Sequence, residues 1–153
     1  SFLGLNLAHN IEEAVRGLHR CRICGAVCEG EICEYCADEE RESDKICIVE
    51  NPKDIFILES NKIYNGRYFV LDAADEDKIA ALREMVSQNG ASELIFALTP
   101  GINSDGIMLY VEDKLADLGL KFTKLAQGVP TGVSLDNVDM LSLIKAINGR
   151  TEI

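Results

Sequence analysis

The length, composition and charge of the chain exclude several classes of protein. With 153 residues it has room for one domain, or one domain with a small appendage. Hydrophobic residues make up 47% of the sequence and charged residues 27%, so we expect a folded core rather than a disordered chain. The formal net charge of −11 disfavours broad neutralisation of nucleic-acid phosphates and suits a basic partner.

The amino-terminal segment predicts a helix and no targeting signal. No apolar run approaches the roughly 18 residues of a membrane span and no signal segment opens the sequence, so we expect a cytoplasmic protein without a membrane partner. Asn10 and Glu13 suit a helix start, and apolar residues recur at helical spacing: Ile11, Ala14, Val15 and Leu18. Because the sequence starts at Ser1 and enters this helix almost at once, we expect residues 1–20 to be an amino-terminal helix left from a longer segment.

Clustered cysteines are the main signal for a site. Five of the six cysteines fall within 16 residues, and four form two C-x-x-C pairs separated by eight residues: Cys21 with Cys24, and Cys33 with Cys36. Each C-x-x-C turn directs two thiolates at one point, so the pairs predict one closed, tetrahedral and structural zinc site. A disulfide framework and unligated buried thiols are the alternatives, and the expected cytoplasmic location weakens the first.

Other candidate ligands near this motif have less regular spacing. Cys28 lies between the pairs, and we interpret it as a spare thiol, although it could replace a neighbour as ligand. His19 precedes the first pair, but four sulfurs already fill the coordination shell. Cys47 lies in an apolar run that predicts a buried strand. The zinc motif is expected to span residues 21–44, where acids far outnumber bases.

After residue 45, short apolar runs alternate with segments of helical period. The runs 46–49, 68–71, 94–98 and 120–125 predict strands. Helices are expected after Asn51-Pro52, from about Asp75 to Asn89, from near Ser104 to Gly119 and from about Asp136 to Asn148. In the last helix an inner apolar stripe is expected at four positions: Val138, Leu141, Ile144 and either Ala146 or Ile147. This alternation predicts an α/β fold with a mainly parallel sheet and helices on both faces.

Candidate chemistry at the carboxyl ends of the strands is sparse. Glu50, Asp72 and Asp105 follow strands and could converge as a weak site for a divalent cation or a partner. Acids near helix starts also stabilise the helix dipole, which weakens this interpretation. The sequence contains neither a phosphate-binding glycine loop nor a nucleophile with a neighbouring base, so we predict no catalytic residue.

A small basic patch precedes and enters the first zinc turn. It consists of Arg16, Arg20 and Arg22, which are candidate DNA contacts. Because the background charge is −11, we do not expect this patch alone to bind DNA tightly.

Taken together, these landmarks resemble the RecR family of bacterial recombination mediators over nearly the whole chain. Besides the cysteine motif, the resemblance rests on the segments 46–54, 66–71, 93–97 and 126–132 and on Gly149-Arg150. It implies a small four-cysteine zinc motif followed by a Toprim domain, a Rossmann-like α/β unit, in residues 45–126, and a carboxyl-terminal segment in residues 127–153. It also implies that residues 1–20 remain from a truncated helix-hairpin-helix region.

The resemblance implies a scaffold of DNA repair rather than an enzyme. Family members self-associate as rings or dimers, bind RecO, with RecF as a second partner, and help load RecA onto gapped single-stranded DNA. DNA contact is then expected mainly within the complex. In this sequence the loop after Leu71 is short, and Asn103 stands where relatives have an acid, although Glu50 matches the Toprim glutamate.

Two alternatives remain at this point. The first is a magnesium-dependent Toprim-type phosphodiester enzyme, a nuclease or a primase-like protein, with Glu50 as general acid or base and Asp105, together with Asp72, holding the metal. The second is an isolated zinc-dependent interaction module of unrelated biology.

Overall fold

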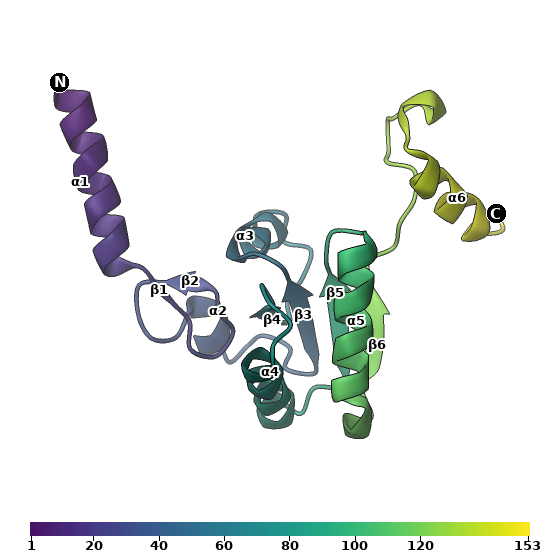
Figure 1. Ribbon diagram of the computed structural model, residues 1–153, viewed down its shortest axis with the longest axis horizontal. Coiled ribbons are helices and arrows are strands. Elements are labelled where there is room, and N and C mark those ends of the chain that lie inside the picture. The colour runs from purple at the N-terminus through teal and green to yellow at the C-terminus, as the bar shows by residue number, and fades with distance from the viewer.

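A four-stranded parallel sheet is the centre of the computed structural model, which describes residues 1–153 (Figure 1). Its strands are β3 (Lys45–Val49), β4 (Arg67–Val70), β5 (Glu93–Ala97) and β6 (Lys121–Lys124), in the order β4-β3-β5-β6. In the register, Ile48 of β3 lies between Phe69 of β4 and Phe96 of β5. The predicted α/β fold and each of its four predicted strands are therefore confirmed.

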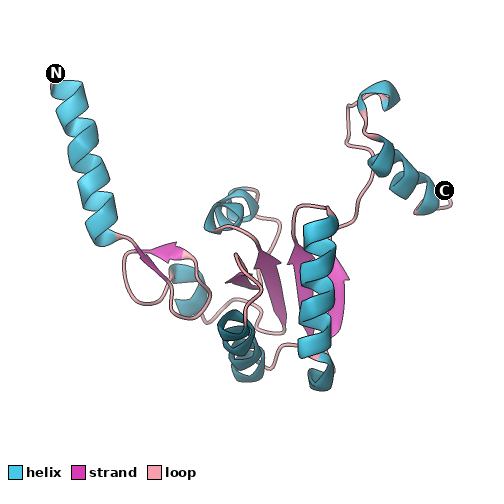
Figure 2. Cartoon of the chain, viewed as in Figure 1, coloured by secondary structure: helices cyan, strands magenta, loops and turns pink.

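Three helices connect the strands and cover the sheet. They are α3 (Pro52–Ser60), α4 (Glu76–Asn89) and α5 (Ile102–Lys114), the last followed by the 3₁₀ turn η1 (Ala116–Leu118). Since crossovers between parallel strands are right-handed and β4 and β5 lie on opposite sides of β3, α3 covers one face and α4 and α5 cover the other. Figure 2 shows these helices around the strands.

Local chemistry sets the ends of two of these helices. Asn51 and Asp54 form a capping box at the start of α3, with Pro52 in the first turn. At the start of α4 the Asp75 carboxylate accepts a hydrogen bond from the Lys78 backbone N–H at 2.9 Å. The helix ends at Gly90, whose φ of +62° favours glycine. The predicted start of α3 and both ends of α4 are confirmed.

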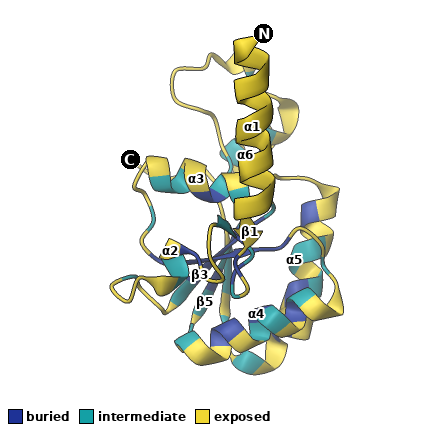
Figure 3. Cartoon of the chain, turned by 90° about the vertical axis from the view of Figure 1, so that its left-hand side faces the viewer, coloured by how far each residue is buried: buried dark blue, intermediate teal, exposed yellow.

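The core lies between the sheet and its helices. Strand β3 is its centre, because Ile46, Ile48 and Val49 have no exposed surface. A run of fully buried apolar residues is typical of a strand in a parallel sheet covered on both faces. The sheet and its three covering helices form the central unit of the molecule. Figure 3 shows that burial concentrates in this central unit and is absent from the helix at the amino terminus.

Two of the predicted helices begin earlier in the structure than expected. Helix α1 (Phe2–Gly17) occupies most of the expected helical segment 1–20, but it begins eight residues before the start suggested at Asn10, because the Ser1 side chain caps it and no proline interrupts the segment. Helix α5 begins at Ile102 rather than near Ser104, which lies in its first turn and donates a hydrogen bond to the Gly101 carbonyl.

The last predicted helix is divided in two. The segment around Asp136 forms the 3₁₀ turn η2 (Leu135–Asn137), and α6 (Met140–Asn148) begins only after Asp139, whose carboxylate accepts from the Ser142 N–H at 2.9 Å. The predicted inner stripe does not reach the core, because α6 contains no buried residue.

Helices α1 and α6 stand away from the central unit at opposite ends of the molecule (Figure 1). Neither has a buried residue, and both expose large apolar side chains. None of the helices in the structure combines the length and the apolar character that crossing a bilayer requires.

Candidate metal centre

The zinc motif is a small hairpin followed by one helical turn. Strand β1 (His19–Arg20) pairs antiparallel with β2 (Val27–Cys28), and the turn between them contains the first cysteine pair. The second pair lies at the start of α2 (Glu34–Ala37), where Cys33 is the N-cap and Cys36 is within the helix. Two separate turns therefore present two thiols each to the same point.

The four sulfur atoms have the spacing of a tetrahedral zinc site. The Sγ atoms of Cys21, Cys24, Cys33 and Cys36 all lie within 4.8 Å of one another. The Sγ–Sγ distance is 3.5 Å between Cys24 and Cys33 and 3.9 Å between Cys21 and Cys36. A tetrahedron with zinc–sulfur bonds of about 2.3 Å has edges of about 3.8 Å. The four thiols fit one zinc ion and are not paired as disulfides.

Backbone N–H groups orient three of the four sulfurs. The N–H groups of Ala26, Cys33 and Cys36 donate to the Sγ atoms of Cys24, Cys21 and Cys33, each at 3.4 Å. Such hydrogen bonds stabilise thiolate ligands. The turn that presents Ala26 needs Gly25 at φ +80°, so the glycine after the first pair has a structural role.

Hydrogen bonds among the four sulfurs shift the pKa values of their thiols. The pKa of Cys24 is raised because its thiol is hydrogen-bonded to Cys33 and Cys36 and is buried. The pKa of Cys33 is lowered to about 2, chiefly by its side-chain hydrogen bonds with Cys24 and Cys36. A zinc ion bound by these four cysteines would hold all four sulfurs as thiolates. Because four thiolates outweigh the two positive charges of the ion, the loaded site is anionic.

Two further cysteines lie outside the four-sulfur group. The Cys28 thiol donates to the Gly30 carbonyl at 3.0 Å and does not join the group. Cys47 is 3% exposed in β3, where burial raises the pKa of its thiol to about 12. Both observations agree with our interpretation of Cys28 as a spare thiol and Cys47 as a core residue.

The zinc motif is bonded to the edge of the sheet. In the backbone, the Val70 N–H of β4 donates to the Cys24 carbonyl at 2.7 Å. The buried Arg67 side chain donates to the carbonyls of Tyr35 and Cys36 at 2.6 and 3.1 Å. The motif therefore covers the edge strand β4, whose backbone would otherwise be open to pairing.

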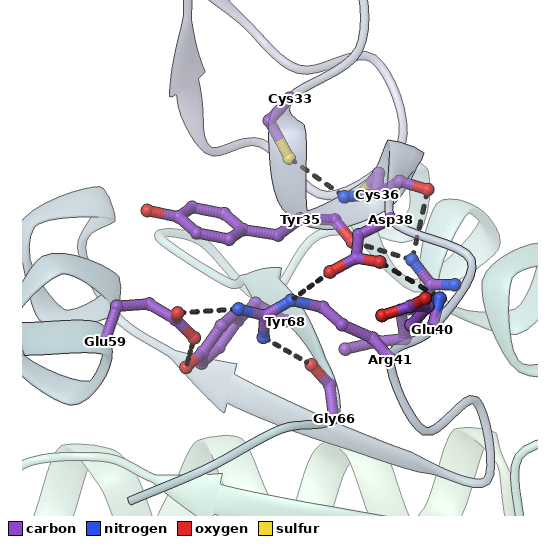
Figure 4. Close-up of polar contacts among 10 residues, drawn as sticks. Cys33, Tyr35, Cys36, Asp38, Glu40, Arg41, Glu59, Gly66 and Tyr68 are labelled. Atoms are coloured by element: carbon purple, nitrogen blue, oxygen red, sulfur yellow. Dashed lines mark hydrogen bonds and ion pairs between the residues drawn. The ribbon is translucent and has the colours of Figure 1, made fainter. Parts of the chain in front are cut away.

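A second bridge to the central unit is centred on Arg41 (Figure 4). Its guanidinium lies 2.6 Å from the Glu59 carboxylate of α3 and donates to the Gly66 carbonyl at 3.1 Å. It also lies over the rings of Tyr35 and Tyr68, with centroid distances of 5.0 and 5.7 Å. Sequence reasoning missed Arg41, although it is the only base among the acid-rich residues 29–44 of the zinc motif.

The ion pair sets the charge state of Glu59. Burial by itself raises the pKa of this carboxyl, but hydrogen bonds from Arg41 and Tyr68 outweigh that effect and lower the pKa below its usual range. The group is therefore held as a carboxylate between a cation and a phenol.

The structure does not gather the predicted cation-binding acids. Glu50, Asp72 and Asp105 form no group of ligand atoms close enough to share an ion. Asp72 instead lies 3.3 Å from the Lys78 ammonium. Asp105 lies in the first turn of α5, where a carboxylate is stabilised by the helix dipole.

The three predicted DNA-contacting arginines are exposed and already have intramolecular partners. Arg16 lies 2.6 Å from the Glu12 carboxylate on α1, and Arg22 lies 3.9 Å from that of Glu31. Arg20 donates to the Gly25 carbonyl at 3.1 Å. Such exposed contacts are weak, so phosphates can compete for these side chains.

Comparison with known protein families gives two matches. The sequence model of the RecR zinc finger domain, a four-cysteine type, matches residues 18–38, and that of the Toprim domain matches residues 44–126. The first range contains all four cysteines of the four-sulfur group, and the second contains the whole parallel sheet.

Known proteins are similar to the chain over almost its full length. Recombination protein RecR of Campylobacter jejuni subsp. doylei is 54% identical over 150 residues, which are 98% of this chain and 79% of the relative. The protein of the same name from Nitratiruptor sp. is 52% identical over 97% of this chain and 78% of its own length. That of Helicobacter pylori strain Shi470 is 46% identical, with shares of 97% and 77%.

Proposed function

Because the chain belongs to the RecR family of recombination proteins, it acts in recombinational DNA repair, and we propose that it does so as a non-catalytic mediator. In this proposal the chain binds RecO, with RecF as a second partner, and helps to load RecA onto gapped single-stranded DNA. The similarity to proteins named Recombination protein RecR, 54% identity over 98% of the chain, is the observation that carries it.

The separation of the acids supports a mediator over an enzyme. A Toprim-type reaction on phosphodiesters needs carboxylates that hold magnesium beside a general acid or base. Asp72 is paired with Lys78, and Glu50 and Asp105 form no cluster with it. We therefore propose that these three acids serve as partner or weak cation contacts.

We also propose that the chain consists of four segments with different roles. Residues 1–20 lead in from a helix-hairpin-helix region, residues 21–44 form the zinc motif, residues 45–126 the Toprim domain and residues 127–153 a carboxyl-terminal segment. The exposed apolar faces of α1 and α6 support the view that the two outer segments act in assembly, because isolated apolar faces gain stability when covered.

The proposed partner contact is electrostatic in origin. A formal charge of −11 favours fast association with a basic protein and predicts that binding weakens as salt rises. Titration of RecO into the chain at low and at moderate salt tests this directly. Absence of binding at both salt concentrations would remove RecO as the partner.

The proposed DNA contact involves Arg16, Arg20 and Arg22. Their replacement by glutamine should weaken capture of gapped DNA by the complex with RecO and should leave RecO binding unchanged. Equal DNA capture by the triple variant and the parent would show that the contact lies elsewhere.

A further inference from the structure

A groove separates the zinc motif from the start of α3. Its volume is about 880 Å³, and its walls come from the segment between β2 and α2, from the first turns of α3 and from the end of α1. Three large apolar side chains line it and remain substantially exposed: Leu18 at 44%, Ile32 at 37% and Phe56 at 51%. Grouped exposed apolar side chains mark a surface that another molecule covers.

The shape of the groove favours a polypeptide over a small ligand. Small-molecule sites enclose most of the ligand surface and hold their lining side chains out of water. Phe56 and Ile32 are instead open to solvent, one on α3 and one on the zinc motif. Such walls can take an apolar side chain between them while the rest of the segment lies outside.

The charges around the groove select a cationic segment. Among its lining residues Glu29 and Glu34 are acids and Lys53 is the only base. Cys33 also lines the groove, so the anionic zinc centre forms part of its wall. Charge complementarity therefore favours a basic partner at this place.

We propose that this groove is the docking site for a basic segment of the protein partner, with one aromatic or branched aliphatic side chain anchored between Ile32 and Phe56. The inference rests on the proposed function, since the partner is the basic protein that binds this chain. The zinc motif then has a second role, because it forms one wall of the docking site and fixes that wall relative to α3.

Binding of RecO to the parent chain and to variants tests the proposal. Phe56→Ser removes one of the two apolar side chains that hold the partner's anchor and should weaken binding about thirtyfold at every salt concentration. Ile57→Ser is the matched control, because Ile57 is 58% exposed on the same helix but does not line the groove. It should bind RecO as the parent does.

Charge variants distinguish binding that depends on the acids of the groove from binding that depends only on the net charge of the protein. Glu29→Lys with Glu34→Lys should weaken binding about tenfold or more at low salt, and the deficit should shrink as salt rises. Glu39→Lys with Glu40→Lys makes the same change in total charge outside the groove and should have a much smaller effect. Lys53→Glu should strengthen binding severalfold, because it removes the only base from the lining.

The outcomes distinguish failure of the docking site from failure of the proposed function. Absence of RecO binding by the parent would remove the partner itself. Normal binding by the parent with equal losses in both double charge variants, or with no loss in Phe56→Ser, would overturn the groove as the site. One zinc per chain and an unchanged melting temperature in each variant exclude misfolding as the cause of any loss.

Discussion

Arg41 should contribute more to stability than any surface ion pair of this protein. Its side chain is 9% exposed and its Glu59 partner is 23% exposed, so removal of the cation leaves a largely desolvated carboxylate. Breaking a buried pair from one side costs about 3 to 5 kcal/mol, and the partial exposure of Glu59 places the expected loss at about 3 kcal/mol. Arg41→Met removes the charge and keeps most of the packing against the two tyrosine rings.

Arg83 provides the matched control. It lies 2.8 Å from Asp117, nearly as close as Arg41 lies to Glu59, but the two side chains are 39% and 65% exposed. Arg83→Met should therefore cost much less stability than Arg41→Met, because solvent screens an exposed pair. Urea unfolding of the parent and both variants measures the difference. Similar losses of unfolding free energy in the two variants would show that burial does not strengthen the ion pair between Arg41 and Glu59.

Three further outcomes are expected. Since the folded-state pKa of Glu59 is lowered, its stabilising effect should be present above pH of about 4.5 and should be lost as pH falls further, so the stability difference between parent and Arg41→Met should shrink in acid unfolding curves. Cys24→Ser should lose zinc and several kcal/mol of stability, whereas Cys28→Ser should keep one zinc per chain; equal melting temperatures with and without a chelator would contradict the first expectation. Gly66→Ala should destabilise the chain by about 1 to 3 kcal/mol in thermal melts, because the new Cβ would overlap the Tyr64 hydroxyl. An unchanged melting temperature would show that the Tyr64 ring moves aside freely.

The features that the sequence predicts well are local. Apolar runs between turn residues indicated the four strands, and the pair Asn51-Pro52 indicated the start of α3 because a cap acts within one turn. The cysteine spacing predicted the four-sulfur group for the same reason, since each C-x-x-C pair is fixed by its own turn. These signals require no knowledge of distant contacts.

The features that the sequence does not predict depend on contacts between distant segments. Arg41 and Glu59 are 18 residues apart, and nothing in their surroundings along the chain indicates that they meet. Arg67 reaches the zinc motif across 31 residues, to the Cys36 carbonyl. Likewise, the sequence places Asp72 just after a strand but does not predict the direction of its side chain. In the structure the Asp72 carboxylate lies beside the Lys78 ammonium.

The apolar stripe of α6 shows a different limit. Its spacing marks an amphipathic helix, but the pattern does not say which surface covers the apolar face. Leu141 and Ile144 are 53% and 48% exposed, so the central unit of the same chain does not cover them. The periodicity therefore predicted the helix correctly, but the expected packing of its apolar face against the core was wrong.

RecA assembly on gapped DNA shows whether the chain acts as a mediator that leaves DNA strands uncut. RecA, RecO and end-labelled gapped DNA are mixed with magnesium, with and without the chain, and both RecA assembly and the integrity of the DNA strands are followed. A non-catalytic mediator should accelerate assembly while every strand stays intact, equally for the parent and for Glu50→Gln. Failure to accelerate assembly would show that the chain is not a mediator of RecA loading, and magnesium-dependent strand cleavage that Glu50→Gln abolishes would show that it is an enzyme.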